Sequence, residues 1–303
     1  MSTEQGVAAS SRLATPELLA RIAGLELRAR AVVEGVISGM HRSPHRGYSV
    51  EFAQHRDYTP GDEIRHIDWR VYGRSDRYYV KQFEEETNLR AYLALDASNS
   101  MRYGSGAMTK LEYASTIAAA LAGLLMRQRD SVGLALCTDS VAGFLPPSAT
   151  APHMREILRR LEQVETAPRT DTGKTFHDLA ERIRRRGLVI ILSDLLDDAE
   201  AIVRGLQHFR HNKHDVIVFH IIDRYELTFP FRETVVFEGM EEEGMLPADP
   251  NALRTDYLRL MEEHITALRK GCREMAIDYV QMPTDAPLDS ALAHYLADRS
   301  RTA

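Results

Sequence analysis

The stretch AYLALDASNS (Ala91–Ser100) changes character at a single residue. Its first half is apolar, as in a strand that is buried on both faces, and the apolar run ends at the carboxylate of Asp96. Two hydroxyls follow at alternate positions, Ser98 and Ser100. Ligands of open α/β sheets collect at the carboxyl ends of the strands, so this cluster of hard oxygen atoms indicates a binding site there.

Apolar and amphipathic segments alternate downstream of this stretch. The pattern predicts strands at 90–96, 131–138, 140–145, 188–193, 215–222 and 276–281. It predicts helices at 109–128, 151–165, 173–186, 198–211 and 252–275, with a last one near 287–298. This alternation predicts an α/β fold with a doubly wound, mostly parallel sheet. The close spacing around Ser140 predicts a hairpin and one antiparallel edge strand.

The first 88 residues differ in pattern from the rest of the chain. Residues 1–14 are small and polar, and we expect a disordered tail. Apolar residues between Pro16 and Met40 have helical spacing, with Thr15 as the N-cap and Pro16 at the first helical position. Short strands with a turn at Thr59–Asp62 are predicted next. We therefore divide the chain into a tail (1–14), an N-terminal helix with a small β-rich region (15–88) and an α/β domain (89–303).

Composition narrows the function classes. A formal net charge of −6 over 303 residues argues against a nucleic-acid-binding surface. Cys137 and Cys272 are far apart in apolar segments, which predicts two buried thiols in a reducing compartment. No secretory signal is evident, and the longest apolar run, Thr116–Met126, is too short to cross a membrane. We expect a soluble cytoplasmic protein.

Two other segments are expected at the same rim of the sheet as Asp96. The run VIILSD ends in Asp194, and the loop RTDT carries Thr170 just before the helix that leads into that strand. Together these segments supply two carboxylates and three hydroxyls, without imidazole or thiolate. Such a set suits Mg²⁺, Mn²⁺ or Ca²⁺ and disfavours zinc or copper. It is also sparse, which leaves a position for water or for a carboxylate from a partner.

DASNS, the threonine in RTDT and the aspartate in LSD resemble the metal-ion-dependent adhesion site (MIDAS) of von Willebrand factor A domains. The resemblance implies a Rossmann-like fold and a metal-ligand role for Asp96, Ser98, Ser100, Thr170 and Asp194. Thr172 and Thr175 are alternatives to Thr170, which matches the family's loop better.

The upstream block EFAQHRDYTPGDEIRHIDWRVYGRSDRYYVKQFEEE (Glu51–Glu86) carries a second resemblance. It is similar to bacterial "domain of unknown function 58" proteins, in which Pro-Gly-Asp and Ile-Asp-Trp motifs precede an A-type domain. Longer members have N-terminal membrane spans, and we expect this chain to be a short form without them. The resemblance implies a non-enzymatic, chaperone-like accessory or assembly factor beside a MoxR-type AAA+ ATPase. It would capture an acidic residue of a partner protein through the metal ion.

The alternative is a Mg²⁺-dependent hydrolase or phosphatase in which Asp96 is the nucleophile. A strand-end aspartate beside Mg²⁺ is a starting point for aspartyl-phosphate chemistry. A phosphatase of the haloacid dehalogenase kind, however, would carry a second aspartate where this chain has Ser98. The sequence also contains no nucleophile elbow, P-loop lysine motif or dinucleotide fingerprint. We therefore favour binding over catalysis.

His208, His211 and His214 form a second candidate cluster, because their spacing suits one helix face. No acidic partner pattern accompanies them. We interpret them as a solvated helix end and not as a transition-metal site.

Overall fold

The computed structural model describes residues 15–42, 55–57, 79–81, 89–168, 171–233, 235–239, 244–289 and 291–293. The chain forms two units. The larger comprises Met1–Arg42 and Leu89–Ala303, and the smaller comprises Ser43–Asn88. Within the smaller unit, β1 (His55–Asp57) and β2 (Tyr79–Lys81) pair in antiparallel fashion. The Pro-Gly-Asp and Ile-Asp-Trp motifs and the predicted tail at 1–14 lie outside the described residues.

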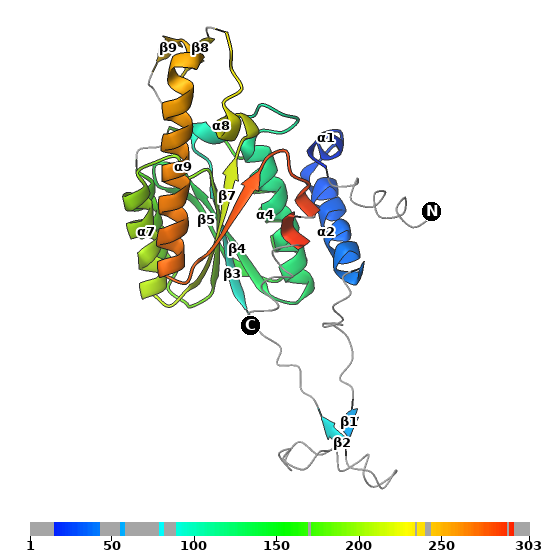
Figure 1. Cartoon of the computed structure of the whole chain (residues 1–303). Helices are drawn as coiled ribbons and strands as arrows, with labels where there is room; N and C mark the ends of the chain where they lie inside the picture. Colours follow the sequence, from blue (N-terminus) through cyan, green and yellow to red (C-terminus); the bar gives the residue numbers. More distant parts are fainter. Residues whose placement is uncertain are drawn as a thin grey trace. The chain divides into compact units, whose positions relative to one another are not determined.

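A six-stranded sheet with the order β10-β7-β6-β3-β4-β5 forms the centre of the larger unit (Figure 1). Its strands are β3 (Arg90–Asp96), β4 (Ser131–Cys137), β5 (Val141–Ser148), β6 (Leu188–Ser193), β7 (Asp215–Ile222) and β10 (Asp278–Pro283). Neighbouring strands are parallel except β4 and β5, which pair in antiparallel fashion at one edge. The prediction of a doubly wound, mostly parallel α/β fold with one antiparallel edge strand is confirmed.

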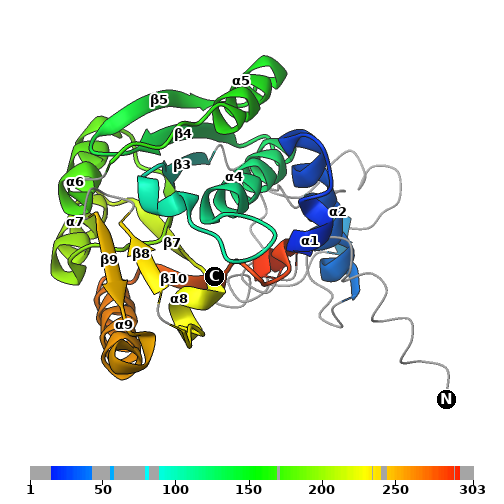
Figure 2. The ribbon, with the colours of Figure 1, turned by 90° about the horizontal axis from the view of Figure 1, so that it is seen from above.

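Helices cover both faces of the sheet (Figure 2). Alternate residues of β3 point to opposite sides, so Leu93 and Leu95 enter one core cluster and Tyr92 and Ala94 enter the other. The first cluster includes α2 (Leu25–Arg42), α4 (Lys110–Arg127) and α5 (Ala151–Glu162). The second includes α6 (Thr172–Arg182), α7 (Ala199–His211) and α9 (Pro250–Glu274).

The two cysteines lie inside the larger unit. Cys137 and Cys272 are both buried as free thiols, as the sequence predicted. Burial raises the pKa of each thiol to about 12, so both are protonated at neutral pH. Within the described part of the chain, no helix combines the length and apolar character needed to cross a bilayer.

The N-terminal helices correct the predicted domain division. The sequence pattern groups them with the β-rich region, but α1 (Pro16–Leu19) and α2 belong to the larger unit. The reason is the apolar face of α2, because Leu25, Val32 and Val36 are all buried in the first core cluster, which they share with α4. Thr15 does occupy the N-cap position of α1, although its side chain makes no capping hydrogen bond.

The segment between β7 and α9 contains elements that sequence analysis did not predict. A short helix α8 (Arg224–Thr228) follows β7, and a hairpin of β8 (Val235–Glu238) and β9 (Met245–Ala248) precedes α9. Four-residue strands and a five-residue helix are too short to show a clear period in the sequence. Of the last predicted helix, residues 288–289 and 291–293 are helical.

Candidate metal centre

The loop after β3 folds back on its own carboxylate. Oδ1 of Asp96 accepts a hydrogen bond from the backbone N–H of Ser98 at 2.9 Å, in a buried position. Ser98 precedes a 3₁₀ turn, η2 (Asn99–Arg102), which brings the Ser98 and Ser100 hydroxyls to 3.0 Å from each other. The structure thus brings together the two hydroxyls that sequence analysis selected, directly after the strand that ends in Asp96.

The segment before Thr170 lies beside this loop. Ala167 forms a parallel bridge with Ser98, in which Asn99 N–H donates to the Ala167 carbonyl and Ala167 N–H donates to the carbonyl of Ala97, each at 3.0 Å. Thr170 itself lies outside the described residues. The segment that leads to Thr170 is nevertheless bound to Ser98 through Ala167, which lies three residues before Thr170.

Asp194 follows β6, the strand beside β3. Its side chain is buried, and its Oδ1 accepts a hydrogen bond from Leu196 N–H at 3.3 Å. The next residue, Leu195, has a positive φ of 51°, which is strained for a branched side chain. The side chain of Leu195 is buried, and two hydrogen bonds hold its backbone. Its N–H donates to Ser193 Oγ, and its carbonyl accepts from His264 Nε2. The backbone that carries Asp194 is therefore fixed from several sides.

A buried lysine contacts the Asp194 carboxylate. Lys110 Nζ lies 2.8 Å from Asp194 Oδ2 and 2.6 Å from Glu226 Oε1. The side chain of Lys110 has no exposed surface, and that of Glu226 is 13% exposed. Burial alone would lower the pKa of Lys110, but the two adjacent carboxylates outweigh burial and raise it above its ordinary value. Lys110 is therefore a cation in the interior.

The end of β7 fixes the second partner of Lys110. Asp223 caps α8, and its N–H donates to the other oxygen of Glu226, Oε2, at 2.8 Å. The Asp223 carboxylate in turn accepts hydrogen bonds from the hydroxyl and N–H of Ser105, from Tyr225 N–H and from Thr284 Oγ1. Burial opposes ionisation of Asp223, but these hydrogen bonds outweigh it and lower its pKa. Glu226 is thus held in place independently of its ion pair with Lys110.

The two alternatives to Thr170 differ in their surroundings. Thr175 Oγ1 donates to the carbonyl of Asp171 at 2.9 Å, as helical threonines often do. Thr172 Oγ1 is buried and has no hydrogen-bond partner among the described residues, while the Thr172 N–H donates to Asp197 Oδ2. Thr172 therefore has an uncommitted hydroxyl, and Thr175 does not.

The chemistry of this donor set fits a hard divalent cation. Asp96 and Asp194 supply carboxylates, and Ser98 and Ser100 supply neutral hydroxyls. Ions such as Mg²⁺ prefer such oxygen ligands and keep several waters. No group of three or more His, Cys, Asp and Glu side chains that could hold a metal occurs in the described ranges.

Three residues around this donor set are not predicted by the sequence pattern: Ser193, Lys110 and Glu226. One signal was available for Lys110, because it stands in the first turn of a helix, where the macrodipole disfavours a cation. The contacts themselves join residues 84 and 116 positions apart and leave no local pattern.

The histidine cluster is only partly a solvated helix end. His208 and His211 are exposed at the end of α7, but His214 is buried. His214 Nδ1 accepts a hydrogen bond from Gly187 N–H, and its Nε2 lies 3.3 Å from the Ile183 carbonyl. The prediction that His214 is solvated was wrong, because the turn after α7 directs it inward to satisfy these backbone groups. His208 packs instead against His177 of α6, with ring centroids 4.2 Å apart.

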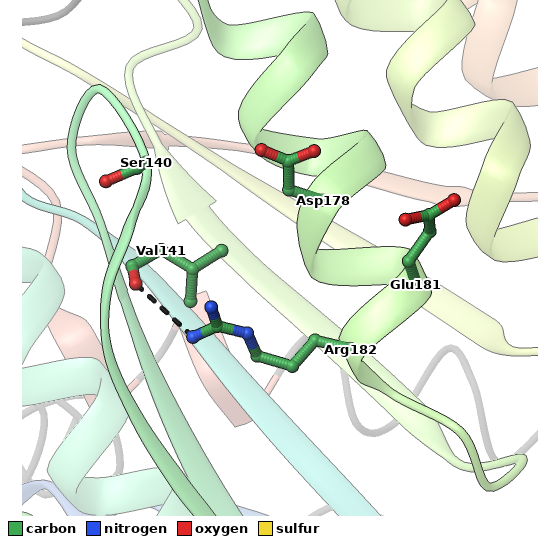
Figure 3. Close-up of a pocket in the computed structure, with 5 residues that line it drawn as sticks. All are labelled: Ser140, Val141, Asp178, Glu181 and Arg182. Carbon is green, nitrogen blue, oxygen red and sulfur yellow. Dashed lines mark hydrogen bonds between the residues drawn. The ribbon is translucent and has the colours of Figure 1, made fainter.

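A pocket occurs away from these contacts, between the β4–β5 turn and α6 (Figure 3). Its lining includes two carboxylates and one guanidinium. The lining residues are Ser140, Val141, Asp178, Glu181 and Arg182. Arg182 points toward the turn and donates a long hydrogen bond, 3.4 Å, to the Val141 carbonyl. None of the lining residues is a proposed metal ligand.

Among solved structures, the chain is similar to BatB from Bacteroides thetaiotaomicron, with 16% identity, a TM-score of 0.47, and coverage of 70% of this chain and 99% of that one. An aerotolerance-related membrane protein from Bacteroides fragilis gives 16% identity and a TM-score of 0.49, with coverage of 71% and 100%. These likenesses are distant, so the fold assignment rests on the strand order described above.

The sequence itself has clearer relatives. An uncharacterized protein of Mycobacterium tuberculosis, Rv1480, is 27% identical over 294 residues, which cover 95% of this chain and 92% of the relative. Its counterpart Mb1516 in Mycobacterium bovis matches equally. Residues 54–267 match the family described as "Protein of unknown function DUF58". The match spans more than half of the chain, and the chain belongs to this family.

Proposed function

We propose that the larger unit is a metal-dependent protein-binding module without enzymatic activity. In this proposal Asp96, Ser98, Ser100, Thr170 and Asp194 form a metal-ion-dependent adhesion site. The ion is Mg²⁺, with Mn²⁺ or Ca²⁺ as substitutes, and an acidic side chain of a partner protein completes its coordination. The family and the von Willebrand factor A-like fold support the broader statement that the chain is a protein-interaction module.

One observation carries the proposal: the oxygen cluster at the end of β3. Asp96 is buried, its loop is fastened by the Ser98 N–H, and the Ser98 and Ser100 hydroxyls are 3.0 Å apart. Two hydroxyl oxygens this close to each other, on the loop that directly follows a buried carboxylate, are oxygen donors of the kind that Mg²⁺ prefers. The neutral hydroxyls leave the ion electrophilic, which favours capture of a carboxylate.

The partner in this proposal is a MoxR-type AAA+ ATPase or a client of that ATPase. This step rests on the family resemblance of the upstream block. The protein would then act in the cytoplasm as a chaperone-like accessory or assembly factor, with no nucleic acid and no membrane span involved.

Two measurements test the proposal. Calorimetric titration with MgCl₂ should show one site that is lost in Asp96→Ala and weakened in Ser100→Ala, Thr170→Ala and Asp194→Asn. A pull-down with the MoxR-type ATPase of the same organism should succeed in Mg²⁺ and fail in a chelator. Asp139→Asn is the matched control, because Asp139 is an exposed carboxylate just beyond the end of β4. Equal Mg²⁺ affinity in Asp96→Ala and the parent protein would refute the proposed site.

The hydrolase alternative has less support. Both oxygens of Asp96 already accept hydrogen bonds, Oδ1 from Ser98 N–H and Oδ2 from the Ser193 hydroxyl. Such bonds stabilise the carboxylate and make it a poorer nucleophile. Mg²⁺-dependent release of phosphate from p-nitrophenyl phosphate, lost in Asp96→Ala, would favour the alternative instead.

A further inference from the structure

Lys110 occupies a place that disfavours its charge. It stands at the start of α4, where the positive end of the helix dipole repels a cation. Its side chain is fully buried, so the ammonium group has given up its hydration. An apolar residue at this position would incur neither penalty. What the ammonium gains in return is two carboxylates, Asp194 and Glu226.

One of these carboxylates is also a proposed metal ligand. Lys110 binds Asp194 through Oδ2, while Oδ1 accepts the Leu196 N–H. A divalent cation that approaches Asp194 therefore meets a carboxylate that is already neutralised. The ammonium and the metal ion carry charges of the same sign and repel each other at a shared carboxylate. The two cations compete.

Glu226 provides the ammonium with a second partner. It is 2.6 Å from Lys110 Nζ, and its other oxygen is fixed by the N–H of Asp223. If a metal ion takes Asp194, Lys110 remains paired with Glu226 and no isolated charge is left in the interior. Lysine suits this task better than arginine, because its ammonium is a compact point charge on a flexible stem.

We propose that Lys110 is an internal counter-cation that sets the affinity of the metal centre. It neutralises Asp194 while no ion is bound, and it shifts to Glu226 when a divalent cation takes Asp194. This inference rests on the proposed metal-binding function. It adds a residue outside the ligand set that determines how tightly the ion binds, and it connects the metal centre to α8, which carries Glu226.

Calorimetric titration of the full chain with MgCl₂ and with MnCl₂ tests the inference through two variants with opposite expected effects. Lys110→Met removes the competitor, and the metal Kd should fall about tenfold or more, the scale of effects from residues just outside a metal's ligands. Glu226→Gln removes the alternative partner of Lys110, and the Kd should rise by about tenfold. Lys174→Met is the control for loss of a positive charge, since Lys174 is exposed in the first turn of α6, and its Kd should stay within about twofold.

The thermal midpoint in chelator and in saturating Mg²⁺ gives a second measurement. Lys110→Met should unfold at a lower temperature than the parent in chelator and should gain more from Mg²⁺ than the parent does. If Lys110→Met does not fold, the direction of the Glu226→Gln effect decides.

Three results would overturn the inference. Weaker metal binding in Lys110→Met, or an unchanged Kd in either variant, would remove the role of Lys110. If Asp194→Asn still weakens metal binding in that case, the proposed metal centre stands without a role for Lys110. If the parent and both variants bind no metal, the proposed function fails and the inference fails with it.

Discussion

The hydroxyl of Ser193 donates a hydrogen bond to Oδ2 of Asp96, across two neighbouring strands of the sheet. β3 and β6 pair in parallel with Leu95 opposite Leu192, so the next residue of each strand comes to the same rim. The other oxygen of Asp96 accepts the Ser98 N–H. The carboxylate is therefore oriented by both strands. The Ser193 hydroxyl also accepts a hydrogen bond from the N–H of Leu195, the residue after Asp194.

Ser193→Ala should weaken the metal centre without removing a ligand. Groups that orient metal ligands typically contribute tenfold to a hundredfold in affinity, so we expect the Mg²⁺ Kd to rise by about tenfold. The variant should also lose about 1–3 kcal/mol of unfolding free energy, because a buried carboxylate oxygen and the Leu195 N–H lose their partner. Calorimetry and urea denaturation measure the two effects. Ser140→Ala, at an exposed turn, should change neither. A normal Kd in Ser193→Ala would show that the bond does not orient Asp96 for the metal.

Removal of the metal should lower the thermal midpoint of the protein. A ligand at one hundred times its Kd stabilises the folded state by about 2.7 kcal/mol, which for a chain of this size corresponds to about 5 °C. The sample is first treated with chelator and then repleted with Mg²⁺. Thermal scans of this sample with and without fresh chelator measure the shift. Asp96→Ala should have the same midpoint in both conditions. A shift that persists in Asp96→Ala would place the stabilising ion elsewhere.

The predictable part of the site is the part that lies on strongly patterned elements. The apolar runs that end at Asp96 and at Ser193 are fully buried strands, so their ends were clear from the sequence alone. Parallel pairing then brings those ends to one rim. The fold class and the approximate location of the candidate ligands follow from these two facts.

The unpredicted part depends on tertiary contacts. Lys110 belongs to a helix that the apolar pattern predicted correctly, yet its partners Asp194 and Glu226 come from the segments that follow two different strands, β6 and β7. Glu226 lies on α8, whose five residues are too few to show a helical period. The sequence places a lysine at the start of a buried helix, and only the folded chain shows what neutralises it.

The N-terminal helix should contribute to the stability of the α/β unit. Val32 of α2 has no exposed surface, and its replacement by alanine should lower the unfolding free energy by about 2 kcal/mol. Leu27→Ala on the same helix is the matched control, because Leu27 is 56% exposed and alanine is a good helix former. Urea denaturation followed by the helical circular dichroism signal measures both. If Val32→Ala is as stable as Leu27→Ala, α2 does not contribute to the core.

The contact between α6 and α7 depends on a glycine at the centre of α7. A Cβ at Gly205 would lie 2.8 Å from the carbonyl oxygen of Gly173 and 3.0 Å from the Cβ of Phe176. Gly205→Ala should therefore destabilise the fold by about 1–3 kcal/mol through overpacking, even though alanine favours the helix itself. Gly106→Ala is the control, because a Cβ there meets nothing within 4 Å. Denaturation midpoints compare the two. Stabilisation in Gly205→Ala would mean that the helices can separate without loss.

His214 should make the folded state sensitive to mild acid. Burial lowers the pKa of His214 and outweighs its hydrogen bond to the Ile183 carbonyl, which favours the protonated ring. A protonated Nδ1 also has no lone pair to accept the Gly187 N–H. The folded pKa thus lies below the unfolded value of about 6.5, so the stabilisation is complete above that pH and is lost as the pH falls below it.

The measurement for His214 is the unfolding free energy between about pH 7.5 and about pH 5.5, which lie about one unit either side of the ordinary histidine pKa. The parent should lose stability toward acid more steeply than His214→Gln, whose amide can accept the Gly187 N–H at every pH. His220, whose pKa burial lowers to about 4, contributes equally to both proteins and cancels in the comparison. His211→Gln, at the exposed end of α7, should keep the slope of the parent. If His214→Gln keeps that slope as well, the protonation of His214 is not linked to unfolding, and the bond from Gly187 survives in acid.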